Sequence, residues 1–289
     1  MSRGLIRRLR TNGAILINGR PSRTSDRVAA GDELAVFLSA RTEPGVKPEA
    51  VPIDVVYEDD HILVVNKPPG LVVHPTRGYP SGTLANGVAG HLAEQGLAPV
   101  VHPVSRLDRN TSGLLVFGKT PHAHDRLARQ MAAGQMKRIY TAVAHGVPEG
   151  DEGAIDLPIR RDPDHPARRM VAEDGQRAVT HYRVIRSWPG ASRLSLSLET
   201  GRTHQIRVHL SHLGYTLFGD RLYGAPEDDD IGRQALHAGT LRLLHPRTAV
   251  PMEFDAPLPS DMAELLHRIA ASSASRRPDE MNEGEKGDQ

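Results

Sequence analysis

Short apolar segments recur along most of the chain, separated by polar, glycine-rich stretches and by segments with helical spacing. A helical stripe follows the N-cap residue Thr83, and Pro121 begins a second helix with Leu127 and Met131 on its apolar face. Clustered strands with helices between them indicate an α+β fold rather than a regular βαβ series. The predicted strands are residues 61–65, 114–117, 139–144, 178–185 and 194–198, the last alternating leucine with polar residues as in a sheet with one wet face.

The first 40 residues read as a small basic module. An arginine-rich helical stretch to about Thr11 precedes strands at 14–17 and 33–38, and Asn18-Gly19 is a strong tight-turn signal. This part resembles the back half of the RNA-binding domain named after ribosomal protein S-four; an ordinary hairpin packed on the main domain is the alternative. The expected organisation is a module at 1–40, a linker at 41–50, a main domain at 51–270 and a disordered tail at 271–289.

Composition narrows the possible chemistry. The chain has no cysteine, which excludes thiolate catalysis, cysteine metal sites and disulfides. No apolar run reaches the ~18 residues of a membrane-spanning helix, so we expect a cytoplasmic protein without membrane contact. The net charge is only +1, yet seven arginines and one acidic residue lie within residues 1–30. This distribution fits an electrostatic footprint for nucleic acid, although arginine-rich genome composition is an alternative explanation.

The polar loop at residues 105–113 places one carboxylate between two guanidinium groups, since Asp108 lies between Arg106 and Arg109. Such an acid stays ionised, which suits attack on carbon, acceptance of a proton, or an ion pair with arginine. The simpler reading is a turn residue in a surface ion pair of small energetic value. The nine residues alone favour this simpler reading.

A second segment changes that balance. Residues 198–210 read Leu-Glu-Thr-Gly-Arg-Thr-His-Gln-Ile-Arg-Val-His-Leu. Together with the 105–113 loop and the shorter stretches 66–75 and 137–142, this segment resembles the RluA-type family of RNA pseudouridine synthases over residues 51–268. The resemblance implies the fold of that family, with a mixed, mainly antiparallel central sheet and flanking helices. It also implies a cofactor-free and metal-free isomerisation of specific uridines in structured RNA.

The resemblance assigns catalytic roles to Asp108, Tyr140 and Arg207. Asp108 either attacks sugar or base as a nucleophile or removes a ribose proton, and the sequence does not choose between these routes. Arg207 pairs with Asp108 in the family, on a helix that we expect to be capped by Thr203 and ended by Gly214. Tyr140 stacks on the target base. Without the resemblance, Arg207 reads as a surface arginine and Tyr140 as a core tyrosine.

The same resemblance implies a substrate-binding set. Arg106 enters the gap that the flipped nucleotide leaves, and Ile206 forms an apolar floor under the uracil, while Ser105 departs from the histidine usual at that position. Ile206, Leu210 and Leu213 are expected on the apolar face of the helix. The remaining expected substrate contacts are Arg202, His204 and Gln205.

Rival readings come from other classes. His209 and His212 are three apart on the predicted helix and suggest a zinc site, and Ser112 with a histidine and Asp108 suggests a hydrolase, but an acidic third ligand and a G-x-S-x-G elbow are missing. An RNA-binding assembly factor without activity is a further alternative. We expect a monomer acting on structured RNA, with ribosomal RNA favoured and transfer RNA possible.

Overall fold

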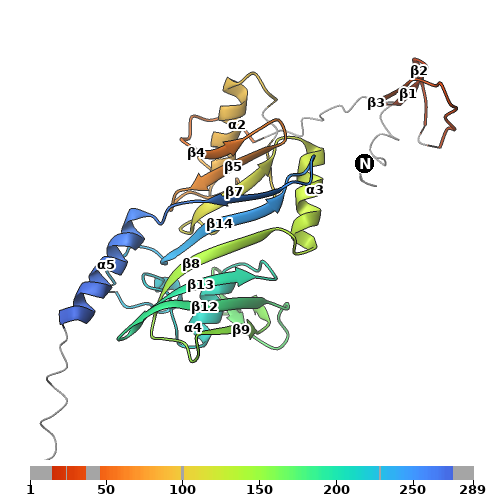
Figure 1. Ribbon diagram of the computed structural model, residues 1–289. Helices are drawn as coiled ribbons and strands as arrows, with labels where there is room; N and C mark the ends of the chain where they lie inside the picture. The colour runs from red at the N-terminus through yellow and green to blue at the C-terminus, as the bar shows by residue number, and fades with distance from the viewer. Residues whose placement is uncertain (1–14, 24, 37–45, 99–100, 228, 276–289) are drawn as a thin grey trace, which may run out of the picture.

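The computed structural model describes residues 15–23, 25–36, 46–98, 101–227 and 229–275, and its main feature is a ten-stranded sheet (Figure 1). The strand order is β4-β5-β7-β14-β8-β13-β12-β9, with β15 paired to β14 and β6 paired to β7. The β7–β14 pair is parallel and the other pairs in this sheet are antiparallel. The predicted α+β fold with a mixed, mainly antiparallel sheet is therefore confirmed.

Five strands of this sheet match the predicted apolar segments and extend most of them, and the pattern does not predict the other five. Their bounds are β4 Asp54–Glu58, β5 Ile62–Lys67, β6 His102–Pro103, β7 Ser112–Gly118, β8 Lys137–His145, β9 Glu152–Asp156, β12 Val179–Trp188, β13 Ala191–Leu198, β14 Leu236–Leu244 and β15 Pro251–Asp255. A separate hairpin pairs β10 (Ile159–Arg161) with β11 (Arg169–Val171).

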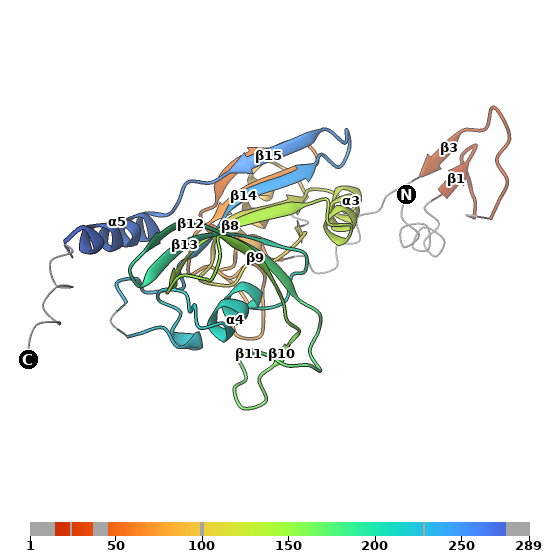
Figure 2. The same ribbon diagram turned by 60° about the horizontal axis from the view of Figure 1, so that its bottom comes forward.

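Helices cover both faces of the sheet because its central strands are apolar on both sides. Leu115 and Phe117 of β7 pack into a cluster with α2 (Leu84–Glu94) and α4 (Gln205–His212). Leu114 and Val116 point to the opposite face, toward α3 (Pro121–Ala132). The long helix α5 (Ser260–Ser275) lies along the side of the body, as Figure 2 shows, and buries Met262 and Leu265 against β8.

The N-terminal residues form a small sheet of their own, from β1 (Ile15–Ile17), β2 (Arg20–Pro21) and β3 (Leu34–Val36). The predicted turn is confirmed: Asn18 and Gly19 have φ values of 54° and 75°, as a tight hairpin turn requires. The Asn18 side chain donates to Asp32 at 2.8 Å and accepts from the Glu33 amide at 2.9 Å. The predicted helix before Thr11 and the linker residues 41–45 lie outside the described residues.

Two helical expectations are wrong in detail. Met131 is 41% exposed, and Gln130 is buried in its place, because its amide pairs with the backbone of Leu244 at 2.7 and 2.8 Å. Helix α5 runs to Ser275, so the first five residues of the predicted disordered tail are helical, and residues 276–289 lie outside the described residues. None of the described helices is long and apolar enough to cross a membrane.

Candidate active site

The 105–113 loop is held residue by residue from two sides. The Asp108 carbonyl accepts a hydrogen bond from the Thr111 amide at 3.1 Å, which closes a turn. The next two carbonyls accept from buried cations, Arg109 O from Lys67 Nζ at 2.9 Å and Asn110 O from Arg233 Nη1 at 3.1 Å. This leaves the backbone that carries the Asp108 carboxylate little freedom to move.

Gly113 allows the backbone of β7 to approach that of β14 closely. Its φ is +114°, and a Cβ there would lie 2.2 Å from the Ala238 carbonyl oxygen of β14. Only glycine fits this position without shifting the parallel β7–β14 pair. The loop is thereby fixed against β14 at its C-terminal end.

Lys67 is completely buried at the end of β5. Its ammonium group donates to the carbonyls of Pro68, Leu71 and Arg109 at 2.8, 3.0 and 2.9 Å. Burial and the nearby charge of Arg233 lower the pKa of Lys67 to about 7, against the opposing effect of Asp108. Lys67 thus ties the segment after β5 to the Asp108 loop.

Arg207 of α4 meets two carboxylates. Its Nη1 lies 3.3 Å from Asp108 Oδ2, and its Nε and Nη2 form two hydrogen bonds of 2.7 and 2.8 Å with Asp220. Burial opposes the charge of Arg207, but the hydrogen bonds and charge of Asp220, together with Asp108, raise its pKa. The expected Arg207–Asp108 contact is present, yet the closer partner of Arg207 is Asp220.

The ring of Tyr223 packs against the guanidinium group of Arg207. The Arg207 guanidinium lies 4.9 Å from the centroid of the Tyr223 ring, a cation–π distance. The Tyr223 hydroxyl accepts from the Arg169 amide at 2.9 Å and lies 2.8 Å from His204 Nδ1. A hydroxyl has two acceptor lone pairs and one proton, so the contact with Nδ1 forms with either tautomer of His204. The other ring nitrogen, Nε2, lies 3.9 Å from Asp108 Oδ2.

The start of α4 differs from the expectation. His204, not Thr203, is the N-cap, and its φ of 59° is unusual for a residue other than glycine. Burial lowers the pKa of His204, although the charge of Asp108 acts in the opposite direction. At the other end Gly214 adopts a φ of +85°, as expected for a helix stop, while Leu213 is 43% exposed instead of on the apolar face.

Tyr140 and Ile206 lie in the same apolar cluster, 6% and 4% exposed respectively, next to Leu107 of the loop. Burial raises the pKa of Tyr140, and the charge of Asp108 acts in the same direction, so the hydroxyl stays protonated at neutral pH. The structure therefore brings the expected residues Asp108, Tyr140, His204, Ile206 and Arg207 together.

The other expected site residues are placed differently. Gln205 is buried, and its amide bonds to Val179 O and Thr180 Oγ1 at 2.9 and 3.1 Å, so its side chain braces β12. Arg202 is exposed and donates to the carbonyl of Arg177 at 3.1 Å. Arg106 is exposed, beside Asp108 in the loop.

The rival chemistries lose their geometric support. Ser112 Oγ does lie 3.0 Å from His237 Nδ1, but both residues are buried and the other nitrogen of His237 faces the Ala256 carbonyl instead of Asp108. Both ring nitrogens of His209 are 2.9 Å from protein oxygens, Thr180 Oγ1 and Leu157 O. Neither a serine hydrolase triad nor a zinc site built on His209 is available.

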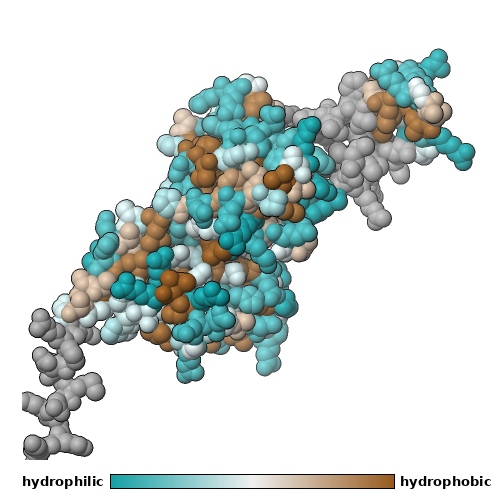
Figure 3. Space-filling model, in the orientation of Figure 1, coloured by the Kyte–Doolittle hydropathy of each residue, from teal (hydrophilic) through white to brown (hydrophobic). Residues whose placement is uncertain are grey.

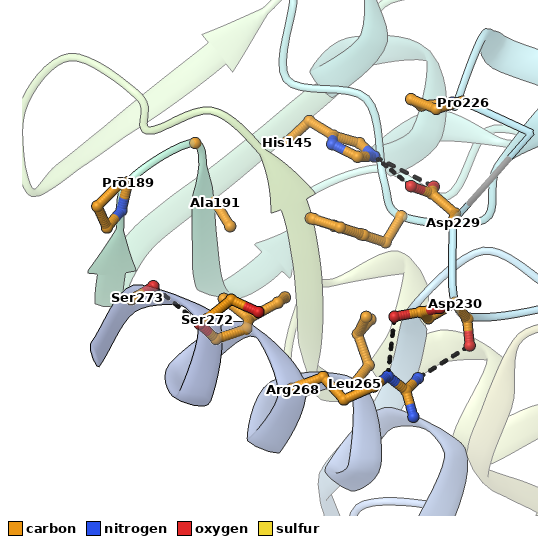
Figure 4. A pocket seen from close by; sticks show the side chains of 13 residues that line it. His145, Pro189, Ala191, Pro226, Asp229, Asp230, Leu265, Arg268, Ser272 and Ser273 are labelled. Atoms are coloured by element: carbon orange, nitrogen blue, oxygen red, sulfur yellow. Dashed lines mark hydrogen bonds and ion pairs between the residues drawn. The ribbon is translucent and has the colours of Figure 1, made fainter. Parts of the chain in front are cut away.

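A separate cavity of about 390 Å³ lies between α5, the β12–β13 turn and the segment before β14 (Figure 4). His145 stacks on Phe218 at 3.7 Å there and lies 3.1 Å from Asp229. None of the residues that line this cavity belongs to the 105–113 loop or to α4. The cavity is distinct from the Asp108 cluster.

Comparison with known proteins agrees with the geometry. Residues 61–212, more than half of the chain, match the RNA pseudouridylate synthase family. The chain belongs to the RluA-type family of RNA pseudouridine synthases. The synthase is thus an enzyme, an RNA uridine isomerase.

Curated relatives extend the match beyond residues 61–212. The chain is 42% identical over 261 residues to the uncharacterized RNA pseudouridine synthase YlyB of Bacillus subtilis, covering 89% of this chain and 86% of that protein. It is 41% identical over 267 residues to the ribosomal large subunit pseudouridine synthase D of Neisseria meningitidis, covering 88% and 71%. The solved structure of human RNA pseudouridylate synthase domain containing 4 superposes with a TM-score of 0.63 at 25% identity, covering 75% of this chain and 93% of that chain.

Sequence reasoning missed several residues that build the synthase site: Lys67, Asp220, Tyr223 and Arg233. Asp220 is 1% exposed, and its neighbour Gly219 has a φ of +70° with no room for a Cβ against the Arg233 carbonyl. The available signal was an aspartate directly after a glycine, Gly219-Asp220. The ion-pair partner of Asp220 is Arg207, which lies 13 residues away on α4, so the sequence around Asp220 does not reveal it.

Proposed function

We propose that the synthase isomerises specific uridines in the RNA of the large ribosomal subunit, with Asp108 as its catalytic carboxylate. The observation that carries this proposal is the placement of Asp108 Oδ2 at 3.3 Å from an arginine that Asp220 holds from behind. The ribosomal substrate is supported by relatives such as the Neisseria protein, whose name states that activity. We further propose that the enzyme acts as a cytoplasmic monomer.

The two oxygens of Asp108 have different surroundings. Arg207 and His204 both face Oδ2, and no hydrogen bond reaches Oδ1 from the described residues. Oδ1 is therefore the atom that attacks carbon or accepts a ribose proton, while Arg207 fixes the direction of the carboxylate. Both routes use the same oxygen, and the geometry serves each of them.

The neighbouring side chains match the needs of a flipped uracil. Tyr140 offers a ring for stacking and a protonated hydroxyl, and Ile206 offers an apolar floor beside it. His204 places its Nε2 atom on the carboxylate side of the site, 3.9 Å from Asp108 Oδ2. Exposed Arg106 is placed to enter the RNA stack when the base leaves it.

Asp108→Asn tests the assignment of the carboxylate. The variant keeps size and turn preference, so we expect a folded protein with near-normal RNA affinity and essentially no pseudouridine under single-turnover conditions. General acid–base assistance is worth about 10²–10⁴-fold, so a loss below about tenfold would contradict the assignment. Asp125→Asn is the matched control, because Asp125 pairs with Arg129 on the surface of α3.

The RNA target is tested by mapping pseudouridines in total RNA from a strain that lacks this protein and from its parent. We expect sites to disappear from large-subunit ribosomal RNA and to return when the wild-type chain, but not Asp108→Asn, is supplied. Sites lost only from transfer RNA would overturn the ribosomal assignment and leave the enzyme class intact.

We propose that residues 1–40 are an RNA-binding module. In its described part Arg20, Arg23 and Arg27 are exposed, and the hydrogen bonds found for residues 15–36 are made within that segment. Deletion of residues 1–40 should weaken binding to long structured RNA, and flatten its salt dependence, more than it slows chemistry on bound RNA, because phosphate contacts release counterions. Unchanged affinity would show that the segment is a structural appendage.

A further inference from the structure

Arg233 connects the catalytic loop to the C-terminal helix. It lies just before β14 and is 7% exposed. Its Nη1 donates to the carbonyl of Asn110, two residues after Asp108, at 3.1 Å. The same nitrogen lies 3.2 and 3.3 Å from the carbonyls of Gln234 and Leu236, which fix it to its own segment.

The other edge of the Arg233 guanidinium forms an ion pair with a carboxylate of α5. Nε and Nη2 of Arg233 donate to the two carboxylate oxygens of Asp261 at 2.6 and 2.9 Å. Burial acts to raise the pKa of Asp261, but the hydrogen bonds and charge of Arg233 hold it below its ordinary value. A planar guanidinium bound on both edges cannot rotate, so Asp261 sets the direction in which Nη1 points.

The neighbouring cation, Lys67, cannot replace this contact. Lys67 donates to the carbonyl of Arg109, which immediately precedes Asn110. Its three ammonium protons are already used in hydrogen bonds to the carbonyls of Pro68, Leu71 and Arg109. The charge of Arg233 also lowers the pKa of Lys67. The two carbonyls that follow that of Asp108 are therefore each bound by a buried basic side chain.

We propose that Arg233 is a positioning residue for Asp108, and that α5 acts on catalysis through Asp261. This inference rests on the proposed role of Asp108 as the catalytic carboxylate. Arg233 and Asp261 both lie outside residues 61–212, the part that matches the family. Loss of the Asp261 carboxylate frees one edge of the guanidinium, loosens the Asn110 peptide and misdirects Asp108, while the side chains of Asp108 and Arg207 stay unchanged.

A merely structural role for Asp261 has to be separated from this one, because α5 also packs Met262 and Leu265 into the core. The same helix carries a second arginine–aspartate pair, Arg268 with Asp230 at 3.0 Å, drawn in Figure 4. That pair has no contact with the catalytic loop. Asp230→Asn is therefore a matched control, which removes one α5 ion pair and leaves the loop untouched.

The experiment measures single-turnover pseudouridine formation, RNA affinity and thermal melting for Asp261→Asn, Arg233→Lys, the double variant and Asp230→Asn. The rates are compared at a temperature where every variant is folded. We expect Asp261→Asn to lower the rate about tenfold or more with unchanged RNA affinity, because small displacements of a catalytic group cost up to about 10²-fold. Arg233→Lys should lower the rate at least as much, and the double variant no further, since both act through one contact.

The inference is overturned if Asp261→Asn reacts as fast as Asp230→Asn, or if the two single effects multiply in the double variant. If Asp108→Asn is inactive and Asp261→Asn is fully active, this inference is wrong and the proposed role of Asp108 stands. An active Asp108→Asn would remove the proposed carboxylate, and with it the reason to position it.

Discussion

The buried pair between Arg207 and Asp220 allows a quantitative test of how the site is held. Asp220 is 1% exposed and Arg207 is 7% exposed, so both charges are shielded from water. The substitution Asp220→Asn preserves size but removes the charge. It also replaces one acceptor oxygen by an NH₂ group that cannot accept a hydrogen bond from the guanidinium.

The expected cost follows from the contacts that remain. Removing one partner of a buried ion pair costs about 3–5 kcal/mol of folding free energy. The asparagine oxygen keeps one of the two hydrogen bonds, and Asp108 still lies 3.3 Å from Nη1 of Arg207. We therefore expect a loss of about 3 kcal/mol, the lower end of that range. For a domain of this size the loss corresponds to a fall in Tm of about 6–12 °C.

The assay is thermal and denaturant unfolding of Asp220→Asn beside Asp108→Asn. The Asp108 side chain is 26% exposed, and its contact with Arg207 should contribute less than about 1 kcal/mol. Stability and activity should thus separate: Asp220→Asn is much less stable and keeps part of its activity, and Asp108→Asn is nearly as stable as wild type and inactive. A Tm for Asp220→Asn within about 2 °C of wild type would refute the claim that Asp220 compensates the buried charge of Arg207.

Two further predictions concern groups with shifted pKa values. Tyr140→Phe removes a hydroxyl that is protonated at neutral pH and keeps the ring. We therefore expect normal folding, nearly normal RNA binding and a reduced single-turnover rate. A wild-type rate would show that Tyr140 acts only by packing or stacking. For Lys67, the pKa falls from 10.5 to about 7 in the folded protein, so between these values the unfolded chain binds more protons and stability rises with pH. We therefore compare the unfolding free energies of wild type and Lys67→Met between about pH 7 and 10. Their difference should grow in favour of wild type by at most about 1.4 kcal/mol per pH unit. A difference that does not change with pH would contradict the burial of the Lys67 charge.

Local pattern predicts the long apolar strands well, whereas the candidate site residues come from the resemblance to a family. Leu194 and Leu196 are buried as their alternation indicates, and Asn18-Gly19 forms the expected turn. Asp108 and Arg207 are 99 residues apart in sequence, and only the resemblance of two motifs to one family brought them together before the structure did. Residues inside a motif are predictable because the motif encodes their shared role.

What sequence reasoning missed depends on partners distant in the chain. Periodicity favours Met131 over Gln130 for burial, because nothing local shows that the end of β14 offers backbone groups to a buried amide. Thr203 is the better N-cap by type, but the Tyr223 hydroxyl holds His204 in that place. The polar composition after Ala271 predicts a tail there, yet α5 continues to Ser275, where the hydroxyls of Ser273 and Ser275 donate to the carbonyls of Ile269 and Ala271.

The parallel pairing of β7 with β14 has a consequence for the order in which the molecule forms. Ser112 and His237 are 125 residues apart, and the Asp108 loop closes only when both strands are present. A nascent chain that has emerged as far as α4 already carries Asp108, Tyr140 and Arg207, but lacks the strand, Arg233 and the helix that set the carboxylate. Such a chain carries these candidate site residues without the segments that hold the Asp108 loop. The site described here is therefore complete only after the chain has been synthesised through α5.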